Sequence, residues 1–302
     1  MKPRSLALAL GTALWGVALT GLAGPPAGDK PNVLFLMADD LRPELGCYGA
    51  GHVISPNIDR LAKRGRMFEH AYCQQALCNP SRASMLTGLR PDSLGIWNLP
   101  THLRQRRPGI VTLPQHFRNN GYFTECVGKI FHNWRQDIHG DPQSWSVPQF
   151  MHYARHDDDK PRVEGKPPGN EIKLPRSTIR DVPDEAYFDG RIATRAIESL
   201  RGLKKNRKPF FLAVGFWKPH LPFNAPKRYW NLYDPAKVKL PESLAKPANG
   251  PDIALHDSRE LLHAFGGRKP STRDIRELRR GYYAATTYMD AQVGRVLDEL
   301  DR

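Results

Sequence analysis

Three groups of polar residues stand where apolar runs of the sequence end: Asp39 with Asp40, Lys129 with His132, and Lys218 with His220. In open α/β sheets the carboxyl ends of parallel strands line the ligand crevice, so these side chains are expected to converge. Adjacent carboxylates offer oxygen ligands for Ca²⁺ or Mg²⁺. Each group alone is more typical of a turn or a loop, but the three together predict a site for a hard metal ion and an oxyanion.

Cys78 is a further candidate for chemistry, because it lies just before a helix expected to start near Pro80. Free backbone N–H groups at a helix N-terminus favour negative charge, and Arg82 adds a cation one turn later. The residues alone leave two alternatives open. Cys78 is either a reactive thiolate or a small hydrophobe packed near a helix cap.

Strand and helix signals alternate around these residues. Continuous apolar runs predict strands at 32–37, 67–71, 123–127 and 209–217. Capping residues and periodicity predict helices at 56–65, 80–86, 112–121, 184–203 and from Ser271 to the C-terminus. The alternation predicts an α/β fold with a mainly parallel sheet. Residues 135–182 are polar and rich in proline, which indicates a long surface insertion that could face the substrate.

Composition excludes several classes of protein. With 302 residues, 40% hydrophobic and only four cysteines, the chain is neither collagen-like, nor a disulfide knot, nor wholly disordered. The net charge of +14 favours an anionic partner such as nucleic acid, acidic lipid or a polyanionic substrate. No zinc-finger spacing or RNP-type motif accompanies that charge, and we expect no nucleic-acid partner.

The N-terminus has the pattern of a secretory signal peptide over residues 1–24. Lys2 and Arg4 precede an apolar run at 6–22, and small residues follow where a signal peptidase could cut. The alternative is an uncleaved anchor, but we expect export to the periplasm or beyond, without stable insertion in a membrane. In an exported chain, the four cysteines could form up to two disulfides.

The motif C-x-P-S-R followed by L-T-G, which starts at Cys78, resembles the motif of the sulfatase family, whose cysteine is converted to formylglycine before folding. The chain resembles the iduronate-2-sulfatase-like branch in particular, from about Lys30 to Arg302. The resemblance implies an alkaline-phosphatase-like α/β fold. It also implies that residues 29–302 are the N-terminal portion of a catalytic domain.

The resemblance implies a role for each candidate residue. Asp39, Asp40 and the formylglycine made from Cys78 would bind one Ca²⁺ ion. One hydroxyl of hydrated formylglycine would attack sulfur and release the alcohol, and deprotonation of the other would then expel sulfate. The remaining roles are orientation of the hydrated aldehyde by Arg82, a base at His132, a sulfate clamp at Lys129, and substrate contacts at Lys218 and His220. His220 is also a candidate for the acid that protonates the leaving oxygen.

The implied function is hydrolysis of sulfate esters on a sulfated sugar or polysaccharide, after maturation by a formylglycine-generating or sulfatase-maturating enzyme. The family completes its metal site with an Asp, then His or Asn, then Gly, and a later lysine, and this sequence stops at Arg302 before them. We therefore expect a C-terminally truncated chain that binds metal poorly and turns over little. The alternatives are a phosphate-ester hydrolase of the same superfamily and an inactive, truncated glycan-binding fragment.

Overall fold

The computed structural model describes residues 30–153, 159, 172–174 (backbone only), 177–206, 208–243, 245–252 and 265–302. The expected signal peptide at 1–24 and much of the expected insertion, namely 154–158, 160–171 and 175–176, lie outside the described residues. Residues 32–302 form one compact unit. Within the described part of the chain, none of the helices is both long enough and apolar enough to cross a membrane.

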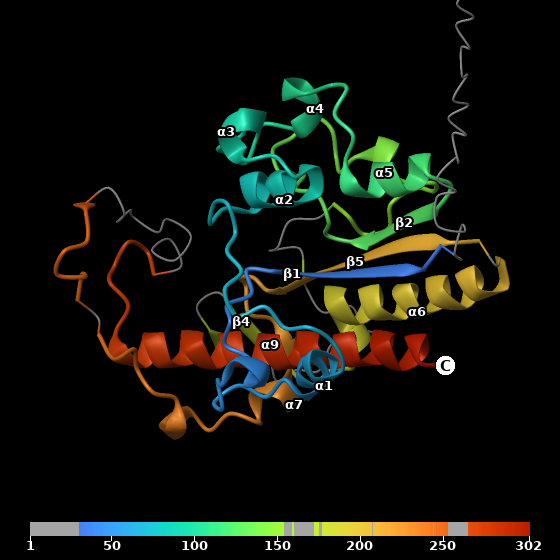
Figure 1. The fold of residues 1–302 in the computed structure, drawn as a ribbon. Helices are drawn as coiled ribbons and strands as arrows, with labels where there is room; N and C mark the ends of the chain where they lie inside the picture. Colours follow the sequence, from blue (N-terminus) through green and yellow to red (C-terminus); the bar gives the residue numbers. More distant parts are fainter. Residues whose placement is uncertain are drawn as a thin grey trace, which may run out of the picture. The chain divides into compact units, whose positions relative to one another are not determined.

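The main sheet has three parallel strands in the order β1-β5-β2 (Figure 1). They are β1 (Val33–Asp39), β2 (Phe123–Gly128) and β5 (Phe210–Pro219). Val33 of β1 and Thr124 of β2 both lie opposite Phe211 of the central strand β5. Every residue of β5 is buried, because a central strand covered on both faces is shielded from water on every side. The strands predicted at 32–37, 123–127 and 209–217 are therefore confirmed, and β2 and β5 are buried as expected, whereas β1 at the edge of this sheet is only partly buried.

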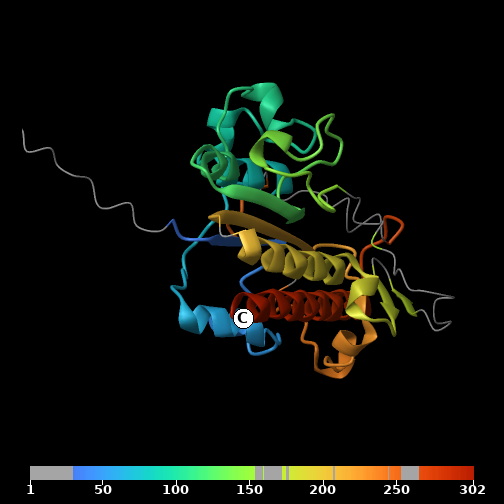
Figure 2. The same ribbon diagram turned by 90° about the vertical axis from the view of Figure 1, so that its right-hand side faces the viewer.

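Helices cover both faces of this sheet (Figures 1 and 2). On one face, α6 (Phe188–Asn206) and α9 (Thr272–Leu300) pack against β5 through a buried aliphatic and aromatic core that includes Val214 and Phe216. On the other face, α2 (Cys78–Thr87) and α5 (Leu113–Asn119) enclose a second core with Phe211. The sheet is thus the middle layer between helices, as predicted for an α/β fold.

The remaining elements are short. They are the helices α1 (Pro56–Arg64), α3 (Pro91–Leu94), α4 (Leu103–Arg106) and α7 (Lys227–Trp230), the single 3₁₀ turns Gly46–Tyr48, Pro142–Ser144, Asp184–Ala186 and Pro235–Lys237, and the strands β3 (Ile172–Leu174), β4 (Ser177–Arg180) and β6 (Ala225–Pro226). The three strands form a small second sheet, in which β3 and β4 are antiparallel and β4 and β6 are parallel. An aromatic core with Tyr229 and Trp230 joins this region to α9.

The predicted helix starts at Thr112 and Ser271 are confirmed by capping boxes. The Thr112 hydroxyl accepts a hydrogen bond from the backbone N–H of Gln115 at 3.3 Å, and the Ser271 hydroxyl accepts one from Asp274 at 3.2 Å. In each case the N3 side chain accepts a hydrogen bond from the backbone N–H of the capping residue, so two donors of the first turn are satisfied.

Several expectations are corrected by the structure. Residues 67–71 form an exposed loop and not a strand, because they pair with no described strand. The helix expected near Pro80 already begins at Cys78, and the helix expected from Asp184 begins at Phe188 after a 3₁₀ turn. All four cysteines are free thiols, so the disulfides that an exported chain could form are absent from the structure.

Candidate functional site

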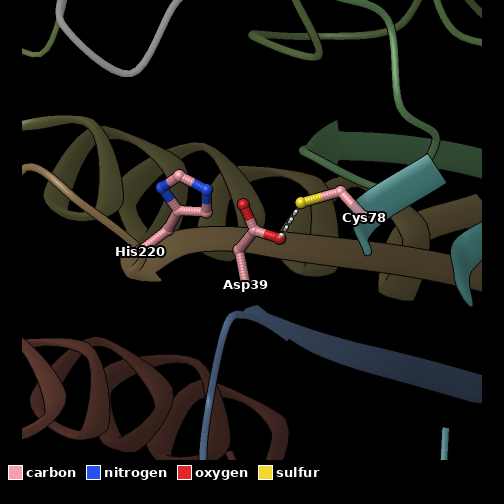
Figure 3. Close-up of side chains that lie close together, drawn as sticks. All are labelled: Asp39, Cys78 and His220. Atoms are coloured by element: carbon pink, nitrogen blue, oxygen red, sulfur yellow. Dashed lines mark hydrogen bonds between the residues drawn. The ribbon is translucent and has the colours of Figure 1, made fainter. Parts of the chain in front are cut away.

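Asp39, Cys78 and His220 meet where three elements end or begin. Asp39 is the last residue of β1, Cys78 is the first residue of α2, and His220 directly follows β5. One ligand atom from each side chain lies within 4.8 Å of the others. Figure 3 shows the Asp39 carboxylate between the imidazole and the thiol, which donates to Oδ1 of Asp39 at 3.8 Å.

The Asp39 carboxylate is held by two buried cations. Nη2 of Arg82 donates to Oδ1 at 2.7 Å, and Nζ of Lys129 pairs with Oδ2. The second terminal nitrogen of Arg82 donates to the backbone carbonyls of Lys129 at 2.8 Å and Ile130 at 2.9 Å. One guanidinium on the second turn of α2 therefore fixes both the end of β1 and the exit of β2. Burial in this low-dielectric setting strengthens each of these contacts.

A close approach of two backbones brings Lys129 to this position. Gly128 has a φ of 86°, a conformation that favours glycine. A Cβ atom on it would lie 2.1 Å from the carbonyl oxygen of Gly215, and a Cβ on Gly215 would lie 2.0 Å from the carbonyl of Lys129. The backbone N–H of Lys129 donates to that same Gly215 carbonyl at 2.8 Å. Side chains at either glycine would force β2 and β5 apart and displace Lys129.

The Cys78 thiol is not activated by these surroundings. Burial raises its pKa above the ordinary value and the Asp39 carboxylate raises it further, while Lys129 and Arg82 act in the opposite direction. The thiol therefore remains protonated near neutral pH, and a protonated thiol is a weak nucleophile. Of the two alternatives that the residues left open, the reactive thiolate is disfavoured.

His132 follows β2 and lies buried beside the same cations. Burial lowers its pKa to about 3, and the positive charges of Lys129 and Arg82 lower it in the same direction. Among the described residues, neither ring nitrogen of His132 has a hydrogen-bond partner of standard geometry. His132 is therefore a neutral imidazole near pH 7, with a nitrogen able to accept a proton.

His220 has a defined tautomer. Its Nδ1 lies 2.6 Å from the carbonyl oxygen of Leu221. A carbonyl oxygen only accepts hydrogen bonds, so Nδ1 carries a proton and donates it. In the neutral ring, Nε2 is then the unprotonated nitrogen, which can accept a proton at the site.

Two predicted site residues are not brought into this group. Asp40 is exposed, with a φ of 61°, and it is not among the described residues that meet at Asp39. The Lys218 side chain is fully buried, and its ammonium donates to the carbonyl of Pro222 at 2.7 Å and pairs with Asp159 at 3.1 Å. The structure thus directs the Lys218 ammonium to other partners, and it does not support Lys218 as a substrate contact.

Two supporting residues carry no signal in the sequence. The hydroxyl of Tyr282 on α9 donates to the carbonyl of Asp40 at 3.1 Å and accepts from the backbone N–H of Arg42 at 2.7 Å. The carboxylate of Asp189 on α6 accepts hydrogen bonds from the backbone N–H groups of Trp217 and Lys218, which precede His220. Both act on backbone groups distant in the sequence, and no motif or spacing in the chain indicates such contacts.

Asp39, Cys78 and His220 are a mixed set of donor groups, and such a set is not well suited to a hard cation. Ca²⁺ prefers six to eight oxygen ligands, and Asp39 supplies carboxylate oxygens at the meeting point. The thiol of Cys78 and the imidazole of His220 are softer donors. Replacement of the Cys78 sulfur by oxygen, as in formylglycine, would bring the set closer to the oxygen ligands that Ca²⁺ prefers.

Comparison with known proteins identifies the family of this chain. The family model described as "Sulfatase" matches residues 31–302. Iduronate 2-sulfatase of Mus musculus is 37% identical over 311 residues, which covers 99% of this chain and 56% of the relative. Iduronate 2-sulfatase of Homo sapiens is 38% identical over 287 residues, which covers 90% of this chain and 52% of the relative. The chain thus spans about half the length of the curated relatives that it matches.

The fold of this chain is also similar to that of solved structures. A phosphonate monoester hydrolase from Silicibacter pomeroyi matches with a TM-score of 0.68 at 23% identity, covering 90% of this chain and 59% of that one. The predicted α/β fold of the alkaline-phosphatase-like class is confirmed, and so is the resemblance to the iduronate-2-sulfatase-like branch. With a family model that covers nearly all of its sequence, the chain belongs to the sulfatase family.

Proposed function

We propose that this protein hydrolyses sulfate esters, with the reacting group placed at Cys78. The observation that carries the proposal is the position of Cys78 at the start of α2, with its sulfur 3.8 Å from Asp39 and about as far from Lys129, at 4.0 Å. An anionic ester placed there would meet the cations of Lys129 and Arg82. Such fixed charges stabilise the negative charge that develops as an S–O bond breaks.

The motif C-x-P-S-R at Cys78 supports conversion of this residue to formylglycine, and the unmodified thiol, whose pKa is raised by burial, would be a poor nucleophile in its place. A protonated, partly buried thiol has little nucleophilic character. The hydrated aldehyde would supply two hydroxyl groups at the same carbon in place of that thiol. Other side chains of this chain would then have to orient the ester and transfer protons.

The described residues divide these tasks by their charge and protonation. Lys129 would hold the sulfate oxygens, and Arg82 would orient the hydrated residue 78. His132, which burial keeps neutral, would accept a proton from residue 78. His220 would contact the sulfate through Nε2 or, when both ring nitrogens are protonated, give the Nε2 proton to the leaving oxygen and keep the proton on Nδ1.

A calcium ion would be held by Asp39, Asp40 and the oxygen of the converted residue 78. When bound, it would offset charge on the sulfate oxygens as a Lewis acid.

A sulfated sugar or polysaccharide is the substrate class that we propose. The net charge of +14 favours a polyanion, and the relatives with 37% and 38% identity are iduronate 2-sulfatases. We also propose export, on the basis of the signal pattern at 1–24, and maturation by a formylglycine-generating or sulfatase-maturating enzyme. A phosphate ester could use the same cations, so substrate choice has to be measured directly.

Peptide mapping by mass spectrometry of the protein from its native host tests the conversion. Trypsin releases residues 67–82, a peptide that holds both Cys73 and Cys78. Cys73 is exposed and serves as an internal control for alkylation. We expect alkylation at Cys73 and the mass of an aldehyde at Cys78. Two alkylated cysteines in a protein that is active on sulfate esters would overturn the assignment of residue 78.

A further inference from the structure

A cluster of ionisable side chains lies buried behind His220. Lys218 and Asp189 are 0% exposed, and Asp159 is 1% exposed. Lys218 belongs to β5, and Asp189 belongs to the first turn of α6. Lys218 and Asp159 form an ion pair of 3.1 Å. Such groups cost several kcal/mol to desolvate, so their partners indicate what the cluster does.

The contacts of this cluster converge on the backbone on both sides of His220. The Asp189 carboxylate accepts the backbone N–H of Trp217 at 2.8 Å and that of Lys218 at 3.1 Å. The Lys218 ammonium donates to the backbone carbonyl of Pro222 at 2.7 Å. The segment that carries His220 is therefore fixed at residues 217 and 218 before it and at residue 222 after it.

The orientation of the His220 ring depends on this same segment. Its Nδ1 proton is held by the carbonyl of Leu221, at 2.6 Å. A shift of that carbonyl would rotate the imidazole away from Asp39 and Cys78, with which it now shares a 4.8 Å group. Burial raises the pKa of Asp189 to about 7, but a carboxyl group in either protonation state has an oxygen that accepts an N–H.

From these contacts we propose that Lys218 and Asp189 are positioning residues, which fix the imidazole of His220 at the catalytic group through the backbone of residues 217–222. The inference rests on the proposed function, because it concerns the same site. Neither side chain touches the reacting atoms. Lys218 thus acts through His220, and not as a contact to substrate.

The test uses the full-length matured protein and variants chosen to separate folding from positioning. Lys218→Met removes the ammonium but leaves Asp159 as an unpaired buried charge, which destabilises the fold. The double variant Lys218→Met/Asp159→Asn removes both charges and is expected to recover stability. The matched control is Glu125→Gln. It neutralises a buried carboxylate on the neighbouring strand β2, which is 6% exposed and accepts from Ser199 at 2.6 Å.

Kinetics with an aryl sulfate give the first readout. We expect the double variant to unfold close to wild type, with kcat at least about tenfold lower, in the range of a misplaced acid–base group. Glu125→Gln should keep the kcat of wild type. In a His220→Gln background, Lys218→Met/Asp159→Asn should cause no further loss of kcat, because residues that act through one another are not additive. An equal loss of kcat in both backgrounds would overturn the proposal.

A second readout does not depend on activity. In ¹⁵N-histidine spectra, we expect the His220 signal, assigned with His220→Gln, to show the Nδ1–H tautomer in wild type and in Glu125→Gln. That signature should be lost in the double variant. Retention of the tautomer together with wild-type kcat would contradict the proposal. If wild type hydrolyses no sulfate ester but the tautomer still depends on Lys218, the proposed function fails while the positioning role stands.

Discussion

Arg82 donates from Nη2 to Oδ1 of Asp39 at 2.7 Å, although the two residues are 43 positions apart in the sequence. The pair joins the end of β1 to the second turn of α2, and the same guanidinium reaches the carbonyls of Lys129 and Ile130. It thereby holds the start of α2, where Cys78 lies, against the carboxyl ends of two strands. The geometry of the site therefore depends on one buried ion pair.

Replacement of Arg82 should destabilise the fold. Arg82→Gln leaves the buried carboxylate of Asp39 with Lys129 as its remaining cation, and we expect the free energy of unfolding to fall by about 3–5 kcal/mol. The control is Arg60→Gln, which breaks an exposed pair with Asp298 and should cost at most about 1 kcal/mol. Urea denaturation measures both. Equal midpoints for the two variants would show that the buried pair is not structurally important.

Replacement of Lys129 should impair catalysis. Lys129→Met removes a fixed cation from the proposed sulfate site, and we expect kcat/KM for an aryl sulfate to fall by about 10²–10³, as for loss of one donor to a developing anion. Lys246→Met provides the comparison, because this lysine pairs with Asp252 at the surface. Steady-state kinetics of the matured protein measure the effect. A similar small change in both variants would exclude Lys129 as a sulfate clamp.

The stability of the fold should decrease in acid because of His132. Its pKa falls from 6.5 to about 3 on folding, so the unfolded chain binds more protons between those values and stability is lost as the pH drops below about 6.5. Between about pH 7 and pH 4.5, this group alone should cost on the order of 2 kcal/mol. His132→Gln should lose less stability than wild type over that interval. Parallel loss in both proteins, measured by urea denaturation, would contradict the assigned environment of His132.

Calcium should stabilise the matured protein through the carboxylates of Asp39 and Asp40 at the end of β1. At a Ca²⁺ concentration of about 100 Kd, binding adds about 2.7 kcal/mol to the free energy of unfolding. A chelator should therefore lower Tm in wild type, and much less in Asp39→Asn or Asp40→Asn. Glu242→Gln, which changes an exposed carboxylate elsewhere, should keep the full calcium-dependent shift in Tm. The same shift in Asp40→Asn would remove Asp40 from the proposed ligand set.

Much of this architecture could be predicted from local sequence. The run Asn32–Met37 and the run before Lys218 lack polar alternation, which indicates strands buried on both faces, and the caps at Thr112 and Ser271 mark helix starts. The spacing of Cys78 and Arg82 places them one turn apart on the same helix. Such local signals are sufficient to predict a strand or a helix start, because each of these features depends on residues that are close in the sequence.

The remaining features depend on contacts between distant segments. The apolar residues at 67–71 resemble a strand, but their side chains are largely exposed because no described strand pairs with them. The direction of the Lys218 side chain is set by Asp159 and Pro222, and the hydroxyl of Tyr282 reaches Asp40 from α9. Neither contact follows from spacing along the chain. Whether the four cysteines pair is likewise decided by which of them the tertiary fold brings together, and all four are free.

The most direct test of the account compares the hydrolysis of 4-nitrophenyl sulfate and 4-nitrophenyl phosphate by the full-length matured protein and by Cys78→Ala. Loss of the residue 78 nucleophile should leave the fold intact, because its side chain is small and only partly buried. We expect a larger kcat/KM for the sulfate than for the phosphate, and a fall of at least about 10³-fold in kcat/KM for the sulfate in Cys78→Ala. Preference for the phosphate, or sulfate hydrolysis that survives in Cys78→Ala, would contradict the account.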